Sequence, residues 1–270
     1  MVMPMPELPW WSLPLVLFVL ACIPMLLAWL RQRVTRNAGI VDVVWAASMA
    51  ASALGYAWIA PGDPAVRIAV AVLGGLWGLR LCLFLLRRVS GEPEDGRYAY
   101  LRRHWNDDQG KFLALFIAQA GFTALLSLPF LAASWNPHLP PAWAWVAAAA
   151  IWLLSVGGEA LADHQLARFR ADPGNRGRSC RAGLWRYSRH PNYFFEWLHW
   201  FAYPLLAIGS PIAWLAWSGP LLMLAFLYRL TGIPYTEAQA LRSRGEDYRA
   251  YQQTTSAFIP WFPKERPHER

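Results

Sequence analysis

The sequence predicts an all-α, polytopic membrane protein: a bundle of seven transmembrane helices with its N-terminus outside and its C-terminus in the cytoplasm. Hydrophobic residues make up 56% of the 270 residues and mean hydropathy is +0.22, which is too apolar for an ordinary soluble domain. The apolar residues recur in stretches of about 20, the length that crosses a hydrocarbon core of about 30 Å. Lys and Arg gather in alternate connecting segments, as loops on the cytoplasmic side do.

Seven apolar stretches are long enough for a span. They cover residues 11–30, 39–60, 66–86, 112–133, 141–162, 192–209 and 211–230. The last two are short and nearly contiguous, and Gly209-Ser210-Pro211 between them predicts a tight hairpin. Since no Lys or Arg precedes Arg31, the positive region of a secretory signal is missing, and we expect the first stretch to remain as a helix.

The distribution of the basic residues predicts the orientation. Of the 25 Lys and Arg residues, 23 lie in four segments that alternate with the spans: 31–36, 87–111, 163–190 and 229–270. An odd number of spans then places these segments and the C-terminus in the cytoplasm. The same distribution accounts for the net charge of +8 without a nucleic-acid partner. Because there is no internal repeat or low-complexity linker, we expect one transmembrane domain over residues 1–270.

A few ionisable residues fall inside the predicted helices, where they are costly unless they face a cavity or a partner: Asp42, Arg80, Glu159, Glu196 and His199. Together they predict a water-accessible pocket toward the cytoplasm. The alternative is a structural ion pair between Asp42 and Arg80. Glu196 and His199 have the spacing used in carboxylate-bridged metal bundles, but the chain lacks the second copy that such sites need. We therefore predict no metal, and a hydrogen-bonded polar pair instead.

Two polar segments could hold an anionic ligand. The first is 91–98, followed by Arg102 and Arg103, and the second is the arginine-rich segment 163–193. The guanidinium fork grips phosphate oxygens in pairs, although anionic lipid headgroups would attract the same arginines. The sequence contains no glycine-rich dinucleotide or P-loop motif, so a nucleotide would have to be held by helix ends and loops.

Two motifs carry a resemblance to a known family. The segment Arg189-His190-Pro191-Asn192-Tyr193, followed by Glu196, and the tail with Glu246-Asp247-Tyr248, Tyr251 and Phe258-Ile259-Pro260 resemble the steroid 5-alpha-reductase family, most closely its bacterial branch. The resemblance covers most of the chain. Similar motifs occur in sterol reductases and isoprenylcysteine carboxyl methyltransferases, which share the bundle architecture.

The resemblance implies NADPH-dependent reduction of the C4–C5 double bond of a 3-oxo-4-ene steroid or a similar isoprenoid lipid enone. It implies a multi-pass protein of a bacterial-type inner membrane, with the active site facing the cytoplasm and the apolar substrate entering from the bilayer. We expect membrane lipids as neighbours and a monomeric chain. Hydride addition to the β carbon makes the enone oxygen negative, so a hydrogen-bond donor at that oxygen stabilises the transition state.

For catalysis, the resemblance places Asp42 as the acid that polarises the 3-keto oxygen, since a carboxyl in an apolar pocket can stay protonated. The family pairs this acid with a Tyr on the third helix, where this chain has Trp77. Trp donates a hydrogen bond but cannot transfer a proton, so Tyr98 or Asn37 is the candidate replacement. The expected catalytic residues are Asp42 and Tyr98. The expected substrate contacts are Asn37, Trp45, Trp77 and Glu196.

For the cofactor, the resemblance implies that Asp163 and Arg170, seven residues apart, contact NADPH and that Asn192 orients the nicotinamide amide. Glu159 stands where the family has an Asn, which is a departure. The full set expected at the cofactor is Arg97, Asp163, Arg170, Arg178, Tyr187, His190, Asn192, Tyr193, Arg229 and Glu237.

Two other functions fit the same residues. The first is an S-adenosylmethionine-dependent lipid or prenyl methyltransferase, because such enzymes share the Arg-His-Pro motif and an acidic tail like Glu237 with Glu246-Asp247-Tyr248. The second is a lipid-binding or structural membrane protein without enzymatic activity. The arginine-rich segment favours NADPH, whose phosphates need cations, over the positively charged sulfonium of S-adenosylmethionine.

Overall fold

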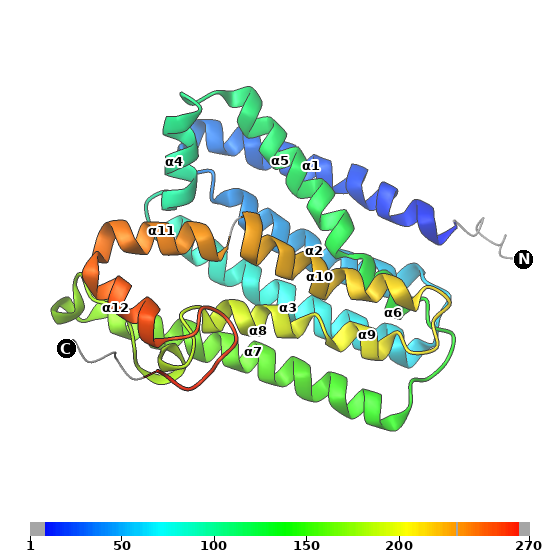
Figure 1. Ribbon diagram of the computed structural model, residues 1–270. Coiled ribbons are helices and arrows are strands. Elements are labelled where there is room, and N and C mark those ends of the chain that lie inside the picture. Colours follow the sequence, from blue (N-terminus) through cyan, green and yellow to red (C-terminus); the bar gives the residue numbers. More distant parts are fainter. Residues whose placement is uncertain (1–8, 231, 265–270) are drawn as a thin grey trace, which may run out of the picture. The chain divides into compact units, whose positions relative to one another are not determined.

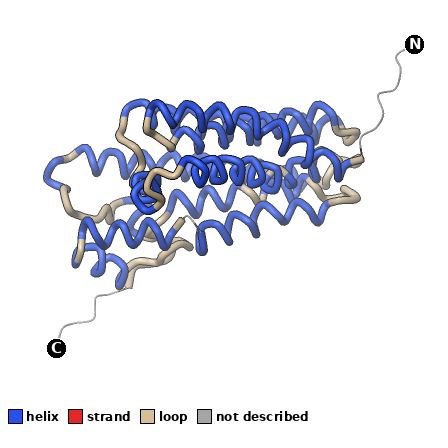
Figure 2. Tube along the Cα trace, turned by 90° about the horizontal axis from the view of Figure 1, so that it is seen from above, coloured by secondary structure: helices blue, strands red, loops and turns tan. Residues whose placement is uncertain are grey.

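A computed structural model describes residues 9–230 and 232–264. This part consists of helices and connecting loops and contains no strand (Figure 2), which confirms the all-α prediction for these residues. The chain forms two compact units. The N-terminal unit runs to Pro141 and includes Leu206–Gly219, and the C-terminal unit comprises Ala142–Leu205 and the residues from Pro220 onward. The single domain expected over 1–270 stays a prediction.

The N-terminal unit is built around long apolar helices. Its elements are η1 (Trp10–Ser12), α1 (Leu13–Thr35), α2 (Ile40–Ile59), α3 (Pro64–Gly91), α4 (Gly96–His104), α5 (Gln109–Leu126), α6 (Leu128–Ser134) and η4 (Ala213–Trp217). Asp63, Asp95 and Asp108 cap the first turns of α3, α4 and α5 by accepting backbone N–H groups. Within this unit α2 packs against α3, and α1 against α5 (Figure 1).

Small residues explain the close contact of α2 with α3. A Cβ at Gly74 would lie 2.6 Å from the Cβ of Ala53, and one at Gly78 would lie 2.8 Å from the backbone nitrogen of Ala50. Membrane helices gain little from burying apolar surface away from lipid, so they associate by such backbone contact. Gly74 and Gly78, four residues apart on α3, therefore make the groove in which α2 lies.

Polar contacts mark the two ends of the N-terminal unit. At one end Asn136, in the loop after α6, donates to the carbonyls of Leu206 (3.0 Å) and Ile208 (2.8 Å) and accepts from the Asp63 N–H (2.7 Å). At the other end Arg36 forms an ion pair with Asp107. The basic segments 31–36 and 87–111 thus share one end of this unit, as their charge predicts.

The C-terminal unit pairs a long helix with shorter ones. Its elements are α7 (Ala142–Ala171), η2 (Pro173–Asn175), η3 (Gly183–Arg186), α8 (Pro191–His199), α9 (Ala202–Leu206), α10 (Ser218–Ala225), the π-turn η5 (Phe226–Leu230), α11 (Ile233–Arg244) and α12 (Glu246–Thr254). In this unit α8 packs along α7, where the absence of a side chain at Gly158 makes room for the Phe195 ring. Arg181 on the α7–α8 segment binds Asp247 of α12 at 3.1 Å.

Six helical stretches in the described residues are long and apolar enough to cross a membrane: Trp10–Thr35, Ile40–Ile59, Pro64–Gly91, Gln109–Ser134, Ala142–Ala171 and Ala213–Arg244. The protein is thus a multi-pass membrane protein by helix length and hydropathy. Residues 192–209, expected as one span, form α8 and α9 instead. The helix breaks near Trp200 and Phe201, so neither piece alone has the length of a span.

Candidate functional site

The N-terminal unit brings Asp42 and Tyr98 together. Asp42 lies in the first turn of α2, and the Tyr98 hydroxyl on α4 donates to its Oδ1 at 2.7 Å. Tyr98 is only 2% exposed. Burial, followed by the negative charge of Asp42, raises the pKa of Tyr98 well above its ordinary value, so the hydroxyl keeps its proton at neutral pH. The two residues expected to be catalytic are in direct contact.

Arg97 completes this cluster. Its guanidinium donates to Asp42 Oδ2 at 2.7 Å and to the Tyr98 hydroxyl oxygen at 2.9 Å, and it lies over the Tyr98 ring at 4.5 Å. Asp42 therefore forms an ion pair with Arg97. Its carboxyl group accepts hydrogen bonds from two donors, Arg97 and Tyr98. The catalytic roles expected of Asp42 and Tyr98 stay predictions.

The residues expected to contact substrate in this unit have different surroundings. Trp45, one turn after Asp42 on α2, stacks on Phe122 at 6.0 Å and meets Trp77 edge-on at 6.2 Å. Trp77 is completely buried. Asn37 instead organises the α1–α2 loop, because its side chain accepts the Gly39 N–H and donates weakly to Val89 O at 3.4 Å. Trp45 is thus a partly exposed aromatic ring one turn from Asp42, whereas Trp77 is part of the core behind it. The contacts of Asn37 hold the α1–α2 loop.

A second polar cluster in this unit holds α4 in place. Arg102 binds Glu94 through two hydrogen bonds, at 2.7 and 3.1 Å, and also contacts Asp107 and Gln32. Glu94 in turn accepts the backbone N–H of Ala38 at 2.8 Å. We call Gln32, Glu94, Arg102, Asp107 and Gln109 the latch. Sequence reasoning missed it, although the helix cap at Asp95 was a signal that 91–111 is more than a loop.

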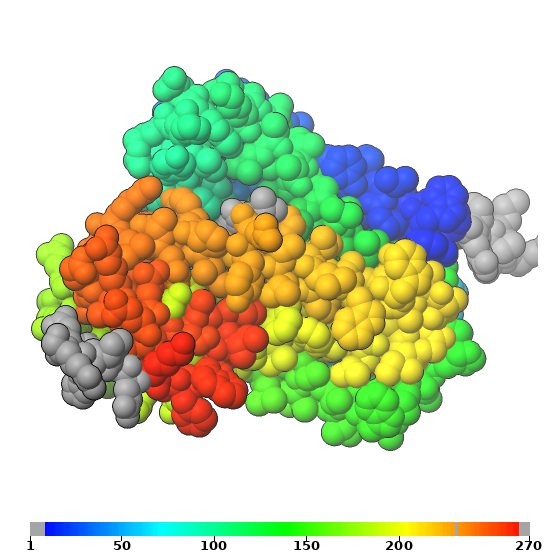
Figure 3. Space-filling model, in the orientation of Figure 1, coloured from blue at the N-terminus to red at the C-terminus, as the bar shows by residue number. Residues whose placement is uncertain are grey.

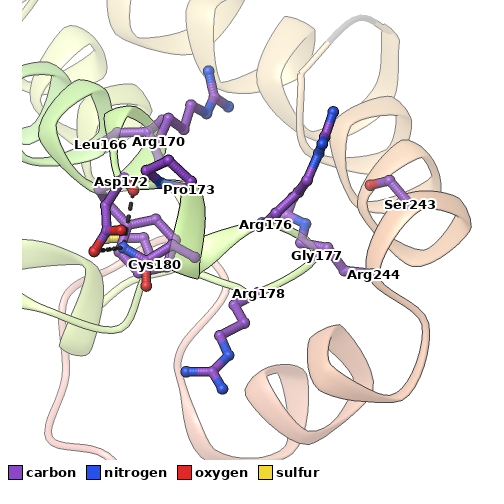
Figure 4. A pocket seen from close by; sticks show the side chains of 12 residues that line it. Leu166, Arg170, Asp172, Pro173, Arg176, Gly177, Arg178, Cys180, Ser243 and Arg244 are labelled. Carbon is purple, nitrogen blue, oxygen red and sulfur yellow. Dashed lines mark hydrogen bonds between the residues drawn. The ribbon is translucent and has the colours of Figure 1, made fainter.

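The C-terminal unit contains an arginine-lined pocket of about 550 Å³. Arg170 at the end of α7, Arg176 and Arg178 on the next loop, and Arg244 at the end of α11 line it (Figure 4). Asp172 is the one acidic side chain among the described lining residues, and the Gly174 N–H donates to it at 2.9 Å. Figure 4 shows the Arg176 and Arg178 side chains pointing in opposite directions from their loop. The pocket is suited to an anion with several separated negative groups.

Glu237 of α11 contacts residues from two other parts of the C-terminal unit, the segment before α8 and α12. It accepts hydrogen bonds from Arg189 at 2.7 Å and Gln252 at 2.8 Å, and it lies 3.3 Å from the His190 ring nitrogen. Tyr248 donates a longer bond of 3.4 Å. Burial lowers the pKa of His190 against the opposing effect of Glu237. The Arg-His motif and the tail therefore meet at Glu237, although they lie far apart in the sequence.

The other residues expected at the cofactor are distributed around the C-terminal unit. Asn192 donates to Asp163 at 3.1 Å, and Tyr193 stacks on His190 at 5.3 Å. Of the set expected from the sequence, Arg170 and Arg178 line the pocket. The remaining two lie as follows: Tyr187 beside Phe262, and Arg229 exposed on η5. Glu196, which was expected to contact substrate, is half-buried on α8.

Fold and site define a helical multi-pass membrane protein with an Asp-Tyr-Arg cluster around buried Tyr98 and an arginine-lined pocket. The chain belongs to the DUF1295 family, described as proteins of unknown function, whose profile matches residues 28–255. An uncharacterized protein of Schizosaccharomyces pombe is 28% identical over 259 aligned residues, which cover 84% of this chain and 73% of the yeast protein. No solved structure matches the chain. The family match includes both the cluster and the pocket.

Proposed function

We propose that this chain is an NADPH-dependent reductase of a lipid enone, of the 3-oxo-5-alpha-steroid 4-dehydrogenase type. The observation that carries the proposal is the 2.7 Å hydrogen bond between buried Tyr98 and Asp42, with Arg97 on the same carboxylate. The Tyr98 hydroxyl is the protonated donor that the resemblance to steroid 5-alpha-reductases requires. Trp77 cannot act as this donor, because it cannot transfer a proton. The partly exposed ring of Trp45, backed by Trp77, suits contact with a flat apolar substrate.

Tyr98 acts as the donor to the enone oxygen, and Asp42 orients it. Arg97 gives Asp42 a second partner, so the Tyr98 hydroxyl can turn to the substrate without leaving the carboxylate unpaired. When bound, NADPH supplies the hydride that adds to the β carbon. The π electrons of the double bond then move toward oxygen, and Tyr98 stabilises the negative charge there by hydrogen bonding or proton transfer. Protonation of the α carbon completes the reduction.

The arginine-lined pocket fits the phosphates of NADPH. The pocket is lined by four arginines, Arg170, Arg176, Arg178 and Arg244, and by one carboxylate, Asp172, which accepts the Gly174 N–H. Its volume of about 550 Å³ is in the range of cofactor sites. Arg176 and Arg178 extend in opposite directions, which suits a pyrophosphate and a separate 2′-phosphate. In this proposal the pocket residues bind the phosphates, while Asn192, fixed by Asp163, orients the nicotinamide amide.

The proposed enzyme crosses the membrane seven times, with its N-terminus outside. In this proposal the apolar stretch 192–209, which α8 and α9 divide between them, is the sixth crossing, because Gly209-Ser210-Pro211 separates it from the following span. The basic segments then lie in the cytoplasm of a bacterial-type inner membrane.

The test uses the purified chain in lipid nanodiscs with NADPH and progesterone or testosterone, followed by mass spectrometry of the steroid. We expect NADPH oxidation with gain of two hydrogens in the product. Tyr98→Phe removes the donor and should lower turnover by about 100-fold or more without weakening NADPH binding. Asp42→Asn should act in the same direction. Tyr100→Phe, at an exposed position on the same helix, is the matched control and should keep wild-type turnover.

Lack of NADPH binding would reject the proposal, as would an active Tyr98→Phe variant. One observation favours a second candidate, the S-adenosylmethionine-dependent methyltransferase: Glu237 collects Arg189, His190 and Tyr248, the motif residues that both enzyme classes share. Calorimetric titration with each cofactor separates the two. Binding of S-adenosylmethionine without binding of NADPH would establish the second candidate.

A further inference from the structure

The residues that follow α12 form an ordered segment, residues 256–264, which we call the C-terminal strap. Four hydrogen bonds fix it to the segment before α8 and to the end of α12. The Arg189 N–H donates to Ser256 O at 2.8 Å, the Ser188 hydroxyl to Phe258 O at 2.7 Å and the Trp261 N–H to Tyr187 O at 2.9 Å. The Lys264 N–H donates to Thr254 O at 2.8 Å. The strap therefore has a defined position within the C-terminal unit.

Phe258 packs the strap against helices that are apolar enough to lie in the membrane. Its ring is 2% exposed and lies 5.5 Å from the ring of Trp197 on α8 and 5.4 Å from that of Tyr228 on η5. Tyr228 belongs to the candidate span Ala213–Arg244. After the polar helix α12, the strap thus packs against a candidate membrane span.

The residues directly after Phe258 present large apolar side chains to the surroundings. Ile259, Trp261 and Phe262 are 57%, 68% and 75% exposed. Figure 3 shows this segment, in red, at the molecular surface beside the orange and red helices α11 and α12. Three such side chains within four positions are unfavourable in water. Tryptophan is enriched where lipid tails meet headgroups, because its ring is apolar and its N–H needs a polar partner.

Positive charge and a cavity accompany these side chains. A cavity of about 350 Å³ lies under the strap, lined by Trp261, Phe262 and Lys264 together with residues 252–257 and Arg189. The Tyr187 ring meets Phe262 at 6.2 Å, and Arg186 next to it is exposed. Among the described residues, Lys264 at the cavity and Arg186 next to Tyr187 are exposed cations, whereas Arg189 is held by Glu237. Apolar rings accompanied by cations complement an anionic phospholipid, with its acyl chains on the rings and its phosphate at the cations.

We propose that the C-terminal strap is a binding site for anionic phospholipid at the membrane interface on the basic side of the protein. Ile259, Trp261 and Phe262 enter the boundary between headgroups and acyl chains. Lys264 and Arg186 bind the lipid phosphate, and the cavity under the strap receives part of the headgroup. This assignment is independent of the proposed reductase activity, because it rests on the strap alone.

Photo-crosslinking in nanodiscs tests the site directly. The full-length chain carrying Phe262→p-benzoylphenylalanine is placed in equal amounts of phosphatidylcholine and phosphatidylglycerol, irradiated, and analysed for lipid adducts by mass spectrometry. The matched control carries the same photo-crosslinker at Glu246, an exposed polar position at the start of α12 and outside the cavity. We expect phospholipid adducts at residue 262 and none at 246, with phosphatidylglycerol several-fold in excess of phosphatidylcholine.

Charge variants test the selectivity. The double variant Arg186→Gln/Lys264→Gln should bring the two adducts at residue 262 to equal amounts, whereas Arg249→Gln, an exposed arginine paired with Glu246, should leave the excess unchanged. Adducts to protein instead of lipid at residue 262 would overturn the proposal. So would equal adducts of the two lipids in the chain without charge substitutions.

Discussion

The two units use their basic segments in opposite ways. In the N-terminal unit the arginines of the basic end are matched with acids: Arg36 with Asp107, Arg88 with Asp95, Arg97 with Asp42, and Arg102 with Glu94. In the C-terminal unit, Arg176 and Arg178 have no ion-pair partner within residues 9–230 and 232–264, and they line an open pocket. Four arginines of the N-terminal unit are thus paired within the protein, whereas Arg176 and Arg178 of the C-terminal unit keep their charge available for a ligand.

The difference shows that membrane topology alone does not explain a basic loop. Both segments carry the positive charge that favours the cytoplasmic side. In segment 87–111 the acids Glu94, Asp95 and Asp107 lie within the same stretch as the arginines, and α4 brings them into contact. In segment 163–190, Asp163 and Asp172 have Asn192 and Gly174 as partners. Arginines without an acidic partner in the protein are therefore a better sign of an anion site than the basic composition of a loop.

Breaking the latch should have the largest effect. Arg102→Met leaves Glu94 without its ion pair in a place where both side chains are about one-eighth exposed, at 13% and 12%. Removing one partner of such a buried pair costs about 3–5 kcal/mol of unfolding free energy. Thermal unfolding in detergent would measure it. Arg103→Met, at an exposed neighbouring position, should have little effect, and an equal loss in the two variants would contradict the latch.

Removing charge from the pocket should affect binding and not stability. Arg176→Gln and Arg178→Gln should each weaken NADPH binding by about tenfold, because a hydrogen bond to a charged group is worth about 1.5–3 kcal/mol. Calorimetric titration gives the affinity, and the unfolding midpoint should stay at its wild-type value. Arg249→Gln, outside the pocket, serves as the control. If neither pocket substitution affected NADPH binding, the charges of Arg176 and Arg178 would not serve that cofactor.

Neutral hydrogen bonds should also hold the basic end of the C-terminal unit, beside the ion pairs Arg181–Asp247 and Arg189–Glu237. The Tyr251 hydroxyl donates to the carbonyl of Trp185 and lies 3.2 Å from that of Ser188. Tyr251→Phe should therefore cost about 1–2 kcal/mol of unfolding free energy, less than the latch variant. Adding salt should leave this loss unchanged. A loss that shrinks with salt would indicate that charge dominates this unit as well.

The smallest effect expected is a pH dependence from His190. Because burial lowers the pKa of His190 below its ordinary 6.5, the folded state prefers the neutral ring. Its contribution to stability is present above about pH 6.5 and is lost as pH falls, since the unfolded chain then binds the proton more readily. The unfolding midpoint should decrease from pH 7 to pH 5 in the wild type and less so in His190→Gln. Identical slopes would contradict the shift.

Part of the site was predictable because its residues are unusual for their surroundings. Asp42 is an acid in an apolar helix, and Tyr98 was one of two candidates for the missing donor. Arg97 was expected at the cofactor, but the structure places it on Asp42. The latch was not foreseen, because Gln32 of α1 meets Glu94 and Arg102 of segment 87–111 only through the way that α1 and α4 pack.

The sequence by itself determined the helical class, the approximate positions of the membrane spans and the shared end of the basic segments in the N-terminal unit. These features depend on the hydropathy and charge of each segment by itself, which decide whether that segment lies in the bilayer or on its cytoplasmic side. Tertiary structure decided that residues 192–209 break into α8 and α9, that Gly74 and Gly78 receive α2, and which arginines are paired. These outcomes depend on contacts between residues distant in the chain, where the geometry of packing selects partners that sequence spacing does not encode.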